Sequence, residues 1–185
     1  NLSGGVEGSL ISCLDETKTA SGARLLKQRV IEPFYRIEQI QDRYNLINWI
    51  LENDINISQY QTDFQSIPDL ERSLSRISLS RGGPRDLFLM SKGLLIIKGI
   101  YENLISNNQV KSISSLLNAI IDNLNIDYSL FSNIKQAIKT DVPLSVKEGN
   151  FIKEGFHKEL DNLRNFRNNE LEFIAKLQKK YSELT

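Results

Sequence analysis

The sequence predicts a mainly α-helical fold: a multi-helix bundle with one long projecting helix and one small β-hairpin or pair of short strands. Apolar residues recur at steps of three and four in several segments, which is the spacing of one helical face. Residues 154–185 contain neither proline nor glycine after Gly155, so we expect a helix of about 30 residues, longer than a compact domain needs. Glu148-Gly149-Asn150 lies between apolar residues and predicts the hairpin turn.

The N-terminal half begins with residues 1–18, which we expect to be a connector with a short extended run over residues 10–14, while residues 19–185 form a single helical domain. Ser21 is expected to cap a helix over residues 23–31, which Pro33 closes. The next helix carries a regular apolar face, widened by Trp49 and Ile50 and made of Ile37, Ile40, Tyr44, Ile47 and Leu51. We expect this helix to be deeply packed. A weaker helix follows over residues 58–65.

Residues 69–87 predict two helices joined by a sharp corner. Leu70, Leu74 and Ile77 share one face of the first helix, with Ser66 and Asp69 at the spacing of a capping box before it. At the corner, Gly82-Gly83-Pro84 combines glycines that can adopt a left-handed, helix-ending conformation with a proline suited to the first turn of the next helix.

The helix after the corner is expected to run for about six turns, with its apolar face made of Leu87, Met90, Leu94, Ile97, Tyr101 and Leu104. Gly93 and Gly99 inside it predict close approach by another backbone, because each costs about 1 kcal/mol relative to alanine. Two further helices are expected over residues 110–124 and 128–138.

Composition excludes several classes of protein. The 23 basic and 23 acidic side chains give a net charge of zero, so the whole chain exerts no bulk attraction on nucleic acid or anionic membrane. A single cysteine and a single histidine exclude an internal disulfide and the usual Cys/His zinc site. No apolar run approaches the roughly 20 residues of a transmembrane helix. We expect a cytoplasmic chain, excised from a longer protein because it begins at Asn1 and ends inside a helical segment.

The arginines of the corner are the main candidates for a functional site, and two interpretations of them remain open. They could bind phosphates, helped by the helix N-terminus at Pro84. They could instead form an internal network with interleaved acids that fixes helices against each other, which the spacing favours. The predicted structural network comprises Asp15, Arg24, Asp69, Glu71, Arg72, Arg76, Arg81, Arg85 and Asp86.

Other candidates are weaker. Lys176, Lys179 and Lys180 are expected to form a solvated face, and if the last helix projects they would also be weak DNA-proximal candidates. Cys13 is expected to be a small buried residue and His157 a surface residue. No residues combine into a catalytic, cofactor-binding or metal site.

Three ordered blocks resemble the core or lever domain of the MutS family of DNA mismatch-recognition ATPases. Residues 14–26 resemble the family's Leu-Asp-x-Thr-x-Thr-x-x-Gly-x-Arg-x-Leu segment. Residues 69–87 resemble its Asp-Leu-Glu-Arg and Pro-Arg-Asp-Leu helix pair, and residues 152–164 are similar to its passage into the outgoing lever helix. The chain departs from the family where Arg29 replaces a common tryptophan, Glu148 an aspartate and Phe156 a tyrosine.

The resemblance implies a mechanical role, in which the lever links the nucleotide state of an ATPase domain to closure of a clamp around DNA. ATP or ADP and magnesium would be held by that ATPase domain, and no cofactor by this chain. The implied partners are mismatched double-stranded DNA, a second MutS subunit and a MutL-type protein, with no membrane. The resemblance also implies that this fragment is not itself an enzyme.

Two other classes stay open from the residues alone. One alternative is a self-contained α-helical protein-interaction module that offers a groove between its helices. The other is an enzyme, which would require paired carboxylates meeting in a pocket.

Overall fold

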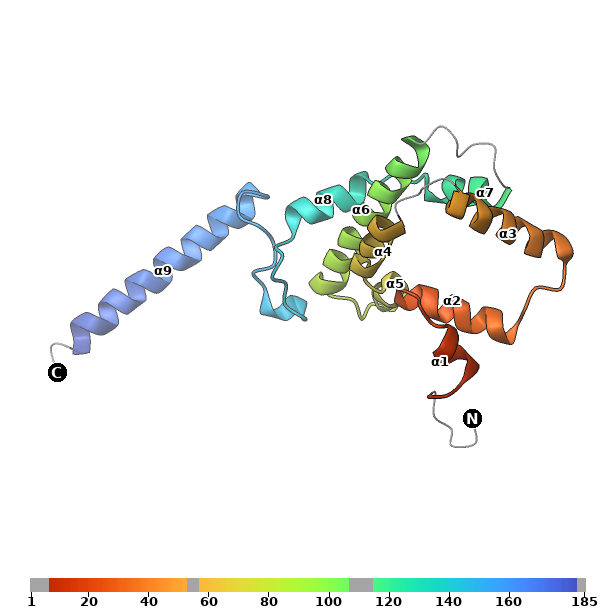
Figure 1. Cartoon of the computed structure of the whole chain (residues 1–185). Coiled ribbons are helices and arrows are strands. Elements are labelled where there is room, and N and C mark those ends of the chain that lie inside the picture. Colours follow the sequence, from red (N-terminus) through yellow and green to blue (C-terminus); the bar gives the residue numbers. More distant parts are fainter. Residues whose placement is uncertain (1–6, 53–56, 107–114, 183–185) are drawn as a thin grey trace.

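The computed structural model describes residues 7–52, 57–106 and 115–182, and confirms the mainly α-helical prediction. Within those ranges there is no β-strand, only an isolated antiparallel bridge between Ile138 and Ile152. The helices form a bundle from which the last one projects (Figure 1). They are α1 (Leu10–Leu14), α2 (Ala20–Ile31), α3 (Ile37–Glu52), α4 (Ile57–Ser66), α5 (Leu70–Ser78), α6 (Pro84–Ser106), α7 (Ser115–Leu124), α8 (Ser129–Ala137) and α9 (Lys158–Ser182).

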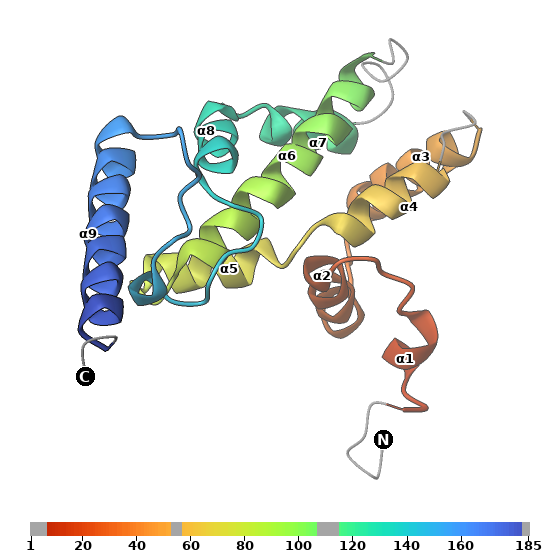
Figure 2. The same ribbon diagram turned by 90° about the vertical axis from the view of Figure 1, so that its left-hand side faces the viewer.

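The 23-residue helix α6 is the spine of the bundle, and α4, α5, α7 and α8 all pack against it (Figure 2). Gly93 allows α5 to approach, because a Cβ at this position would lie 2.6 Å from Leu70 Cδ2. Gly93 is therefore closely packed, but against side-chain atoms of Leu70 and Pro68 rather than the backbone that was predicted. The prediction is wrong at Gly99, where a Cβ would meet nothing within 4 Å. Ile100 is buried on α6, and the fully buried Ser91 donates its hydroxyl to the Phe88 carbonyl at 2.9 Å.

Helix α3 packs on α7 through the Trp49 and Ile50 edge of the expected face and not through its main apolar stripe. Trp49 and Leu117 form the buried contact, with Leu46, Ile50 and Ile121 packed around it. The predicted deep packing of the other apolar face is wrong: Ile37, Tyr44, Ile47 and Leu51 are 76%, 58%, 50% and 67% exposed. Burial of α3 is therefore concentrated on the Trp49 side, which faces the rest of the bundle.

The N-terminal elements differ from their predictions in local detail. Residues 10–14 form the short helix α1 rather than an extended run, and Cys13 is exposed rather than buried. Thr19, not Ser21, caps α2, since the Gly22 N–H donates to Thr19 Oγ1 at 2.9 Å.

Helix α5 buries a narrower face than expected. Leu74 is 53% exposed, and Ser73 takes its place on the buried side. The cap is Asp69, whose Oδ1 accepts from the Arg72 N–H at 3.2 Å, whereas Ser66 donates its hydroxyl back to the Thr62 carbonyl inside α4. The predicted capping box is therefore replaced by a single aspartate cap.

At the corner, Pro84 begins α6 as predicted, but the left-handed residue is Ser80 (φ 55°) and not a glycine. The glycines instead allow close approach. A Cβ on Gly82 would lie 2.7 Å from Ile77 Cγ1, and one on Gly83 would lie 2.6 Å from the Leu144 carbonyl oxygen.

The segment before α9 is not the predicted hairpin around Glu148-Gly149-Asn150. Val146–Glu148 is a turn of 3₁₀ helix, and Gly149 and Asn150 both have positive φ. Ile152 forms its isolated antiparallel bridge with Ile138, at the end of α8, rather than with Val146. Helix α9 then leaves the bundle, and its Leu163, Phe166 and Phe173 are exposed.

Candidate functional site

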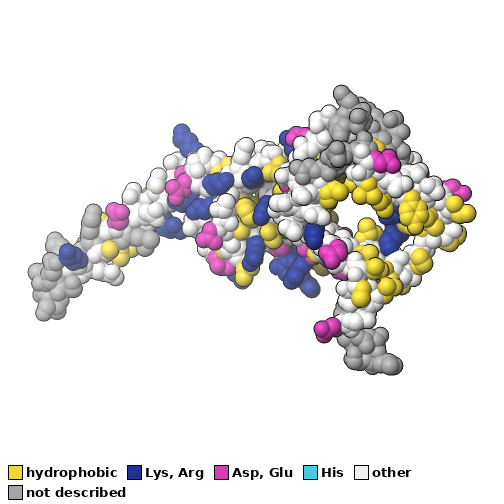
Figure 3. Space-filling view, viewed as in Figure 1, with side chains coloured by type: hydrophobic (Ala, Val, Ile, Leu, Met, Phe, Trp, Pro, Cys, Tyr) yellow, Lys and Arg dark blue, Asp and Glu magenta, His cyan; other side chains and the backbone are white. Residues whose placement is uncertain are grey.

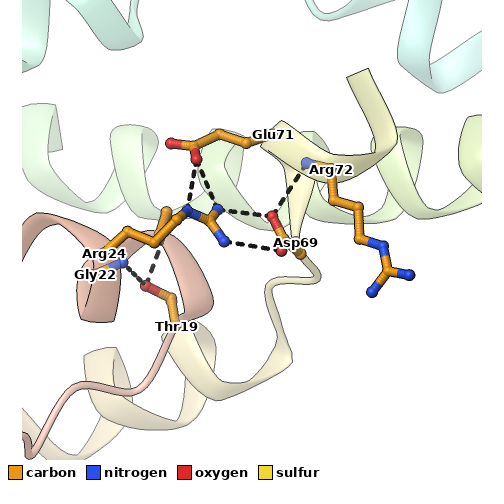
Figure 4. Close-up of polar contacts among 7 residues, drawn as sticks. Thr19, Gly22, Arg24, Asp69, Glu71 and Arg72 are labelled. Atoms are coloured by element: carbon orange, nitrogen blue, oxygen red, sulfur yellow. Dashed lines mark hydrogen bonds and ion pairs between the residues drawn. The ribbon is translucent and has the colours of Figure 1, made fainter. Parts of the chain in front are cut away.

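Arg24 on α2 holds two acids at the start of α5 (Figure 4). Its Nη1 and Nη2 donate to the two Asp69 carboxylate oxygens at 3.0 and 2.8 Å, and its Nε donates to Glu71 Oε2 at 2.8 Å. The planar guanidinium suits this two-pronged geometry, which an ammonium group does not reproduce. The contact ties α2 to the bundle across 45 residues of sequence.

The charges of Arg24, Asp69 and Glu71 reinforce one another. The hydrogen bond from Arg24 lowers the pKa of Asp69, and the Asp69 carboxylate in turn raises the pKa of Arg24 above its usual value. Asp69 therefore stays ionised and acts both as the cap of α5 and as the anchor for α2. Because Arg24 is about half exposed, water and salt screen this attraction.

A second ion pair lies inside the corner itself. Arg76 Nε donates to Asp86 Oδ1 and Oδ2 at 3.2 and 3.1 Å, and its Nη2 donates to the Arg81 carbonyl at 3.0 Å. Asp86 is buried, and its Oδ2 also accepts from the Gly83 N–H at 2.9 Å. The aspartate thus caps α6, opposes the positive end of its dipole and joins it to the last turn of α5.

The other predicted network residues are not drawn into these pairs. For Arg72, Arg81 and Arg85 the structure shows no guanidinium ion pair with any residue that it describes. Figure 4 shows the Arg72 side chain directed away from the acids. Asp15 accepts from Thr17 N and Thr17 Oγ1 at 3.0 and 2.6 Å, which lowers its pKa without any arginine.

A pocket of about 520 Å³ lies between α5 and the first turns of α6. It is lined by Asp69, Arg72, Ser73, Arg76, Arg85, Asp86, Leu89 and Leu144. Its two acids are already paired, so its walls present excess positive charge.

A further joint, which sequence reasoning missed, anchors the long helix. Asp161 Oδ2 accepts from the Gly155 N–H at 2.8 Å, and its Oδ1 accepts from Arg164 Nη1 at 3.1 Å. Arg164 Nη2 donates to the Ile152 carbonyl at 2.8 Å. These contacts fix the first turn of α9 to the segment that bridges back to α8. An Asp and an Arg three residues apart at the start of a helix were the available signal.

The connection back to α8 is made of backbone bonds. The Lys139 N–H donates to the Phe151 carbonyl at 2.9 Å, and the Lys153 N–H donates to the Ala137 carbonyl at 2.7 Å. Ala137 and Ile138, at the end of α8, are buried. The long helix is therefore rooted in the bundle through a short hydrogen-bonded path.

The lysines of α9 and His157 are the remaining candidates from the sequence. Lys179 is exposed on α9, while the side chains of Lys176 and Lys180 lie outside the described part of the structure. His157 is exposed and accepts from the Leu160 N–H through Nδ1 at 3.4 Å, at the start of α9.

The described residues offer little for metal or membrane chemistry. No group of three or more His, Cys, Asp or Glu side chains within them is arranged to hold a metal ion. None of their helices is long and apolar enough to cross a membrane.

Comparison with known proteins settles the family. The model of MutS domain III matches residues 1–185. The chain belongs to the MutS domain III family. The DNA mismatch repair protein MutS of Ruegeria sp. (strain TM1040) is 37% identical over 185 residues, covering 100% of this chain and 21% of that protein. The DNA mismatch repair protein MutS of Bartonella tribocorum is 36% identical over 185 residues, covering 99% of this chain and 20% of that protein.

The chain therefore spans about one-fifth of the length of these MutS proteins. It corresponds to the core and lever region, as the three sequence blocks indicated. In these relatives the region is one part of a longer protein, so a self-contained interaction module is not favoured.

Proposed function

We propose that this domain is the lever of a MutS-type DNA mismatch repair protein, and that it couples the nucleotide state of an ATPase domain to a DNA clamp. The match to MutS domain III over the whole chain carries this proposal. The rooted helix α9 supports it, because a lever must be fixed at one end and stiff along its length. A 25-residue helix is about 37 Å long.

The bundle supplies a rigid base for this movement. Rotation of the spine α6 carries α8 with it through their packing, and the bridge between Ile138 and Ile152 passes the movement to the root of α9. The contacts of Asp161 and Arg164 then keep the helix from pivoting freely at its first turn. Packed elements of this kind move as rigid bodies rather than bending continuously.

Nucleotide and DNA binding belong to other domains of the longer protein. ATP or ADP and magnesium are bound by the ATPase domain, and this domain holds no cofactor and catalyses no reaction. Mismatched double-stranded DNA is bound by the clamp and the mismatch-reading domain. A second MutS subunit and a MutL-type protein complete the set of partners. The proposed protein is cytoplasmic and has access to DNA, in keeping with relatives that are named DNA mismatch repair proteins.

The test uses the full-length parent protein and the substitution Arg164→Met at the root of α9. Loss of this guanidinium frees the Ile152 carbonyl and loosens the joint, so binding of mismatched DNA should alter the rate of ATP hydrolysis less than in the unaltered protein. Basal ATP hydrolysis should stay within about twofold, because the substitution lies outside the ATPase domain.

Arg167→Met is the matched control, because this exposed arginine lies three residues further along α9. Within the described residues its one hydrogen-bond partner is the neighbouring Asn168, at 3.5 Å. Equal coupling in the Arg164 variant, the Arg167 variant and the unaltered protein would contradict the lever role of this root. Loss of coupling in both variants would show that general surface charge, not the joint, is responsible.

A further inference from the structure

The exposed face of α3 has the pattern of a coiled-coil seam. Ile37, Tyr44 and Leu51 are spaced seven residues apart. Ile40 lies three residues after Ile37, and Ile47 lies three residues after Tyr44. Apolar residues alternating at steps of three and four are the a and d positions of a heptad repeat, which pack into a partner helix. Because α7 covers the Trp49 side, this seam is a second apolar face of the same helix.

The seam borders an opening in the molecule. Figure 3 shows a gap between α2 and α3 with hydrophobic side chains along its rim and basic side chains among them. A pocket of about 340 Å³ lies here, lined by Arg29, Pro33, Phe34, Ile40, Arg43, Tyr44 and Ile47.

Two arginines in this pocket carry charge that no described residue neutralises. The guanidinium carbons of Arg29 and Arg43 lie 4.1 and 4.7 Å from the centre of the same Phe34 ring. Neither guanidinium forms an ion pair with a described residue, and Arg29 Nε is buried without a hydrogen-bond partner. A ring face offsets only part of the repulsion between two such cations, and a buried donor without an acceptor is costly.

The charges along the seam identify its partner. Arg36 and Arg43 occupy the flanking positions of the heptad, where coiled coils place residues that pair with the opposite helix. The acids of α3, Glu38, Asp42 and Glu52, lie at positions away from the seam. A second copy of α3 would place these arginines against each other if antiparallel, or against Gln41 and Asn48 if parallel, and offers them no carboxylate in either case. An acidic helix would pair with the arginines.

We propose that the α3 seam and the Arg29–Phe34–Arg43 pocket bind an acidic amphipathic helix from another part of the same parent polypeptide. This inference depends on the proposed function, because the helix must come from the rest of a MutS-type protein. About four-fifths of the length of the MutS relatives lies outside the matched region. A helix in the same polypeptide competes at high effective concentration. Its apolar stripe fills the seam, and its carboxylates pair with the guanidiniums of Arg29 and Arg43.

The test places a photocrosslinking amino acid, benzoylphenylalanine, at residue Tyr44 of the full-length parent. Irradiation followed by mass spectrometry should yield a crosslink within one polypeptide, to a helical segment with Asp or Glu beside an apolar heptad stripe. The double substitution Arg29→Met with Arg43→Met should reduce the crosslink yield about tenfold, while Lys92→Met on the exposed side of α6 should not.

Each other result overturns the proposal. A crosslink between α3 helices of two subunits would assign the seam to a second copy. A crosslinked segment without acids, or a yield unaffected by the arginine substitutions, would remove the role of the charges. Absence of any crosslink, with residues 37–51 exchanging amide hydrogens as fast as an unpacked helix, would show that the seam stays open. The Arg164→Met coupling test probes α9 and not α3. A negative crosslinking result would therefore refute the α3 proposal without affecting the conclusion about the lever.

Discussion

Substitution of Asp86 tests whether the corner between α5 and α6 is held by a buried charge. In Asp86→Ala, the buried Gly83 N–H loses its charged acceptor, which costs about 1.5–3 kcal/mol. The lost pair with half-exposed Arg76 adds only about 0.5 kcal/mol. Removing negative charge from the first turn of α6 adds about 0.5 kcal/mol. We expect a total of about 3 kcal/mol.

For a domain of this size the loss corresponds to a fall in Tm of about 6–12 °C. Circular dichroism at increasing temperature and at increasing urea concentration measures it. Asp86→Asn is the matched control, since an amide oxygen of the same shape can still accept from Gly83, and it should cost about 1 kcal/mol. If Asp86→Ala destabilises the protein by less than 1 kcal/mol, the corner does not depend on this carboxylate.

Four further substitutions have expected outcomes. Gly99→Ala should stabilise α6 by about 0.5–1 kcal/mol because the space is open, whereas Gly93→Ala should destabilise it by about 1–3 kcal/mol, both measured by urea unfolding. Asp69 has a pKa below its usual 3.8 in the folded state, so its stabilisation is present above pH 3.8 and is lost as the pH falls through the lower folded value. The stability difference between the unaltered protein and Arg24→Met should therefore shrink in acid. Arg76→Ala should lower Tm by about 2–4 °C without weakening DNA binding by the parent protein, and the reverse result would favour a phosphate contact.

Periodicity predicted the positions of α3, α5 and α6 because each has a regular local apolar repeat. The long last helix was predicted from the absence of helix breakers after Gly155, but it begins at Lys158 rather than at residue 154. The hairpin was wrong because glycine and asparagine at 149 and 150 are equally compatible with a turn after a 3₁₀ helix. Which residue pairs with Ile152 depends on how distant segments pack, and the residues of the turn alone do not determine it.

Burial was harder to predict than helix position. The pattern on α3 identified an apolar face but not which of its two apolar sides the bundle would cover. For the arginine corner, spacing indicated that acids and arginines would meet, yet the structure divides them between Arg24 and Arg76. Pairing across 45 residues depends on how α2 is placed against α5, which no sequence spacing specifies.

The two ends of the domain are held by contacts of different strength. Between the spine and α9, every joint is either buried, as at Ala137 and Ile138, or tied by several hydrogen bonds to the backbone. At the other end, α2 is held to the bundle by the ion pairs of Arg24, which solvent screens, and the seam of α3 is exposed. The α2–α3 end should therefore open first in hydrogen exchange. A helix filling the seam would add the buried apolar contact that this end lacks, so its arrival would stiffen the base on which the lever turns.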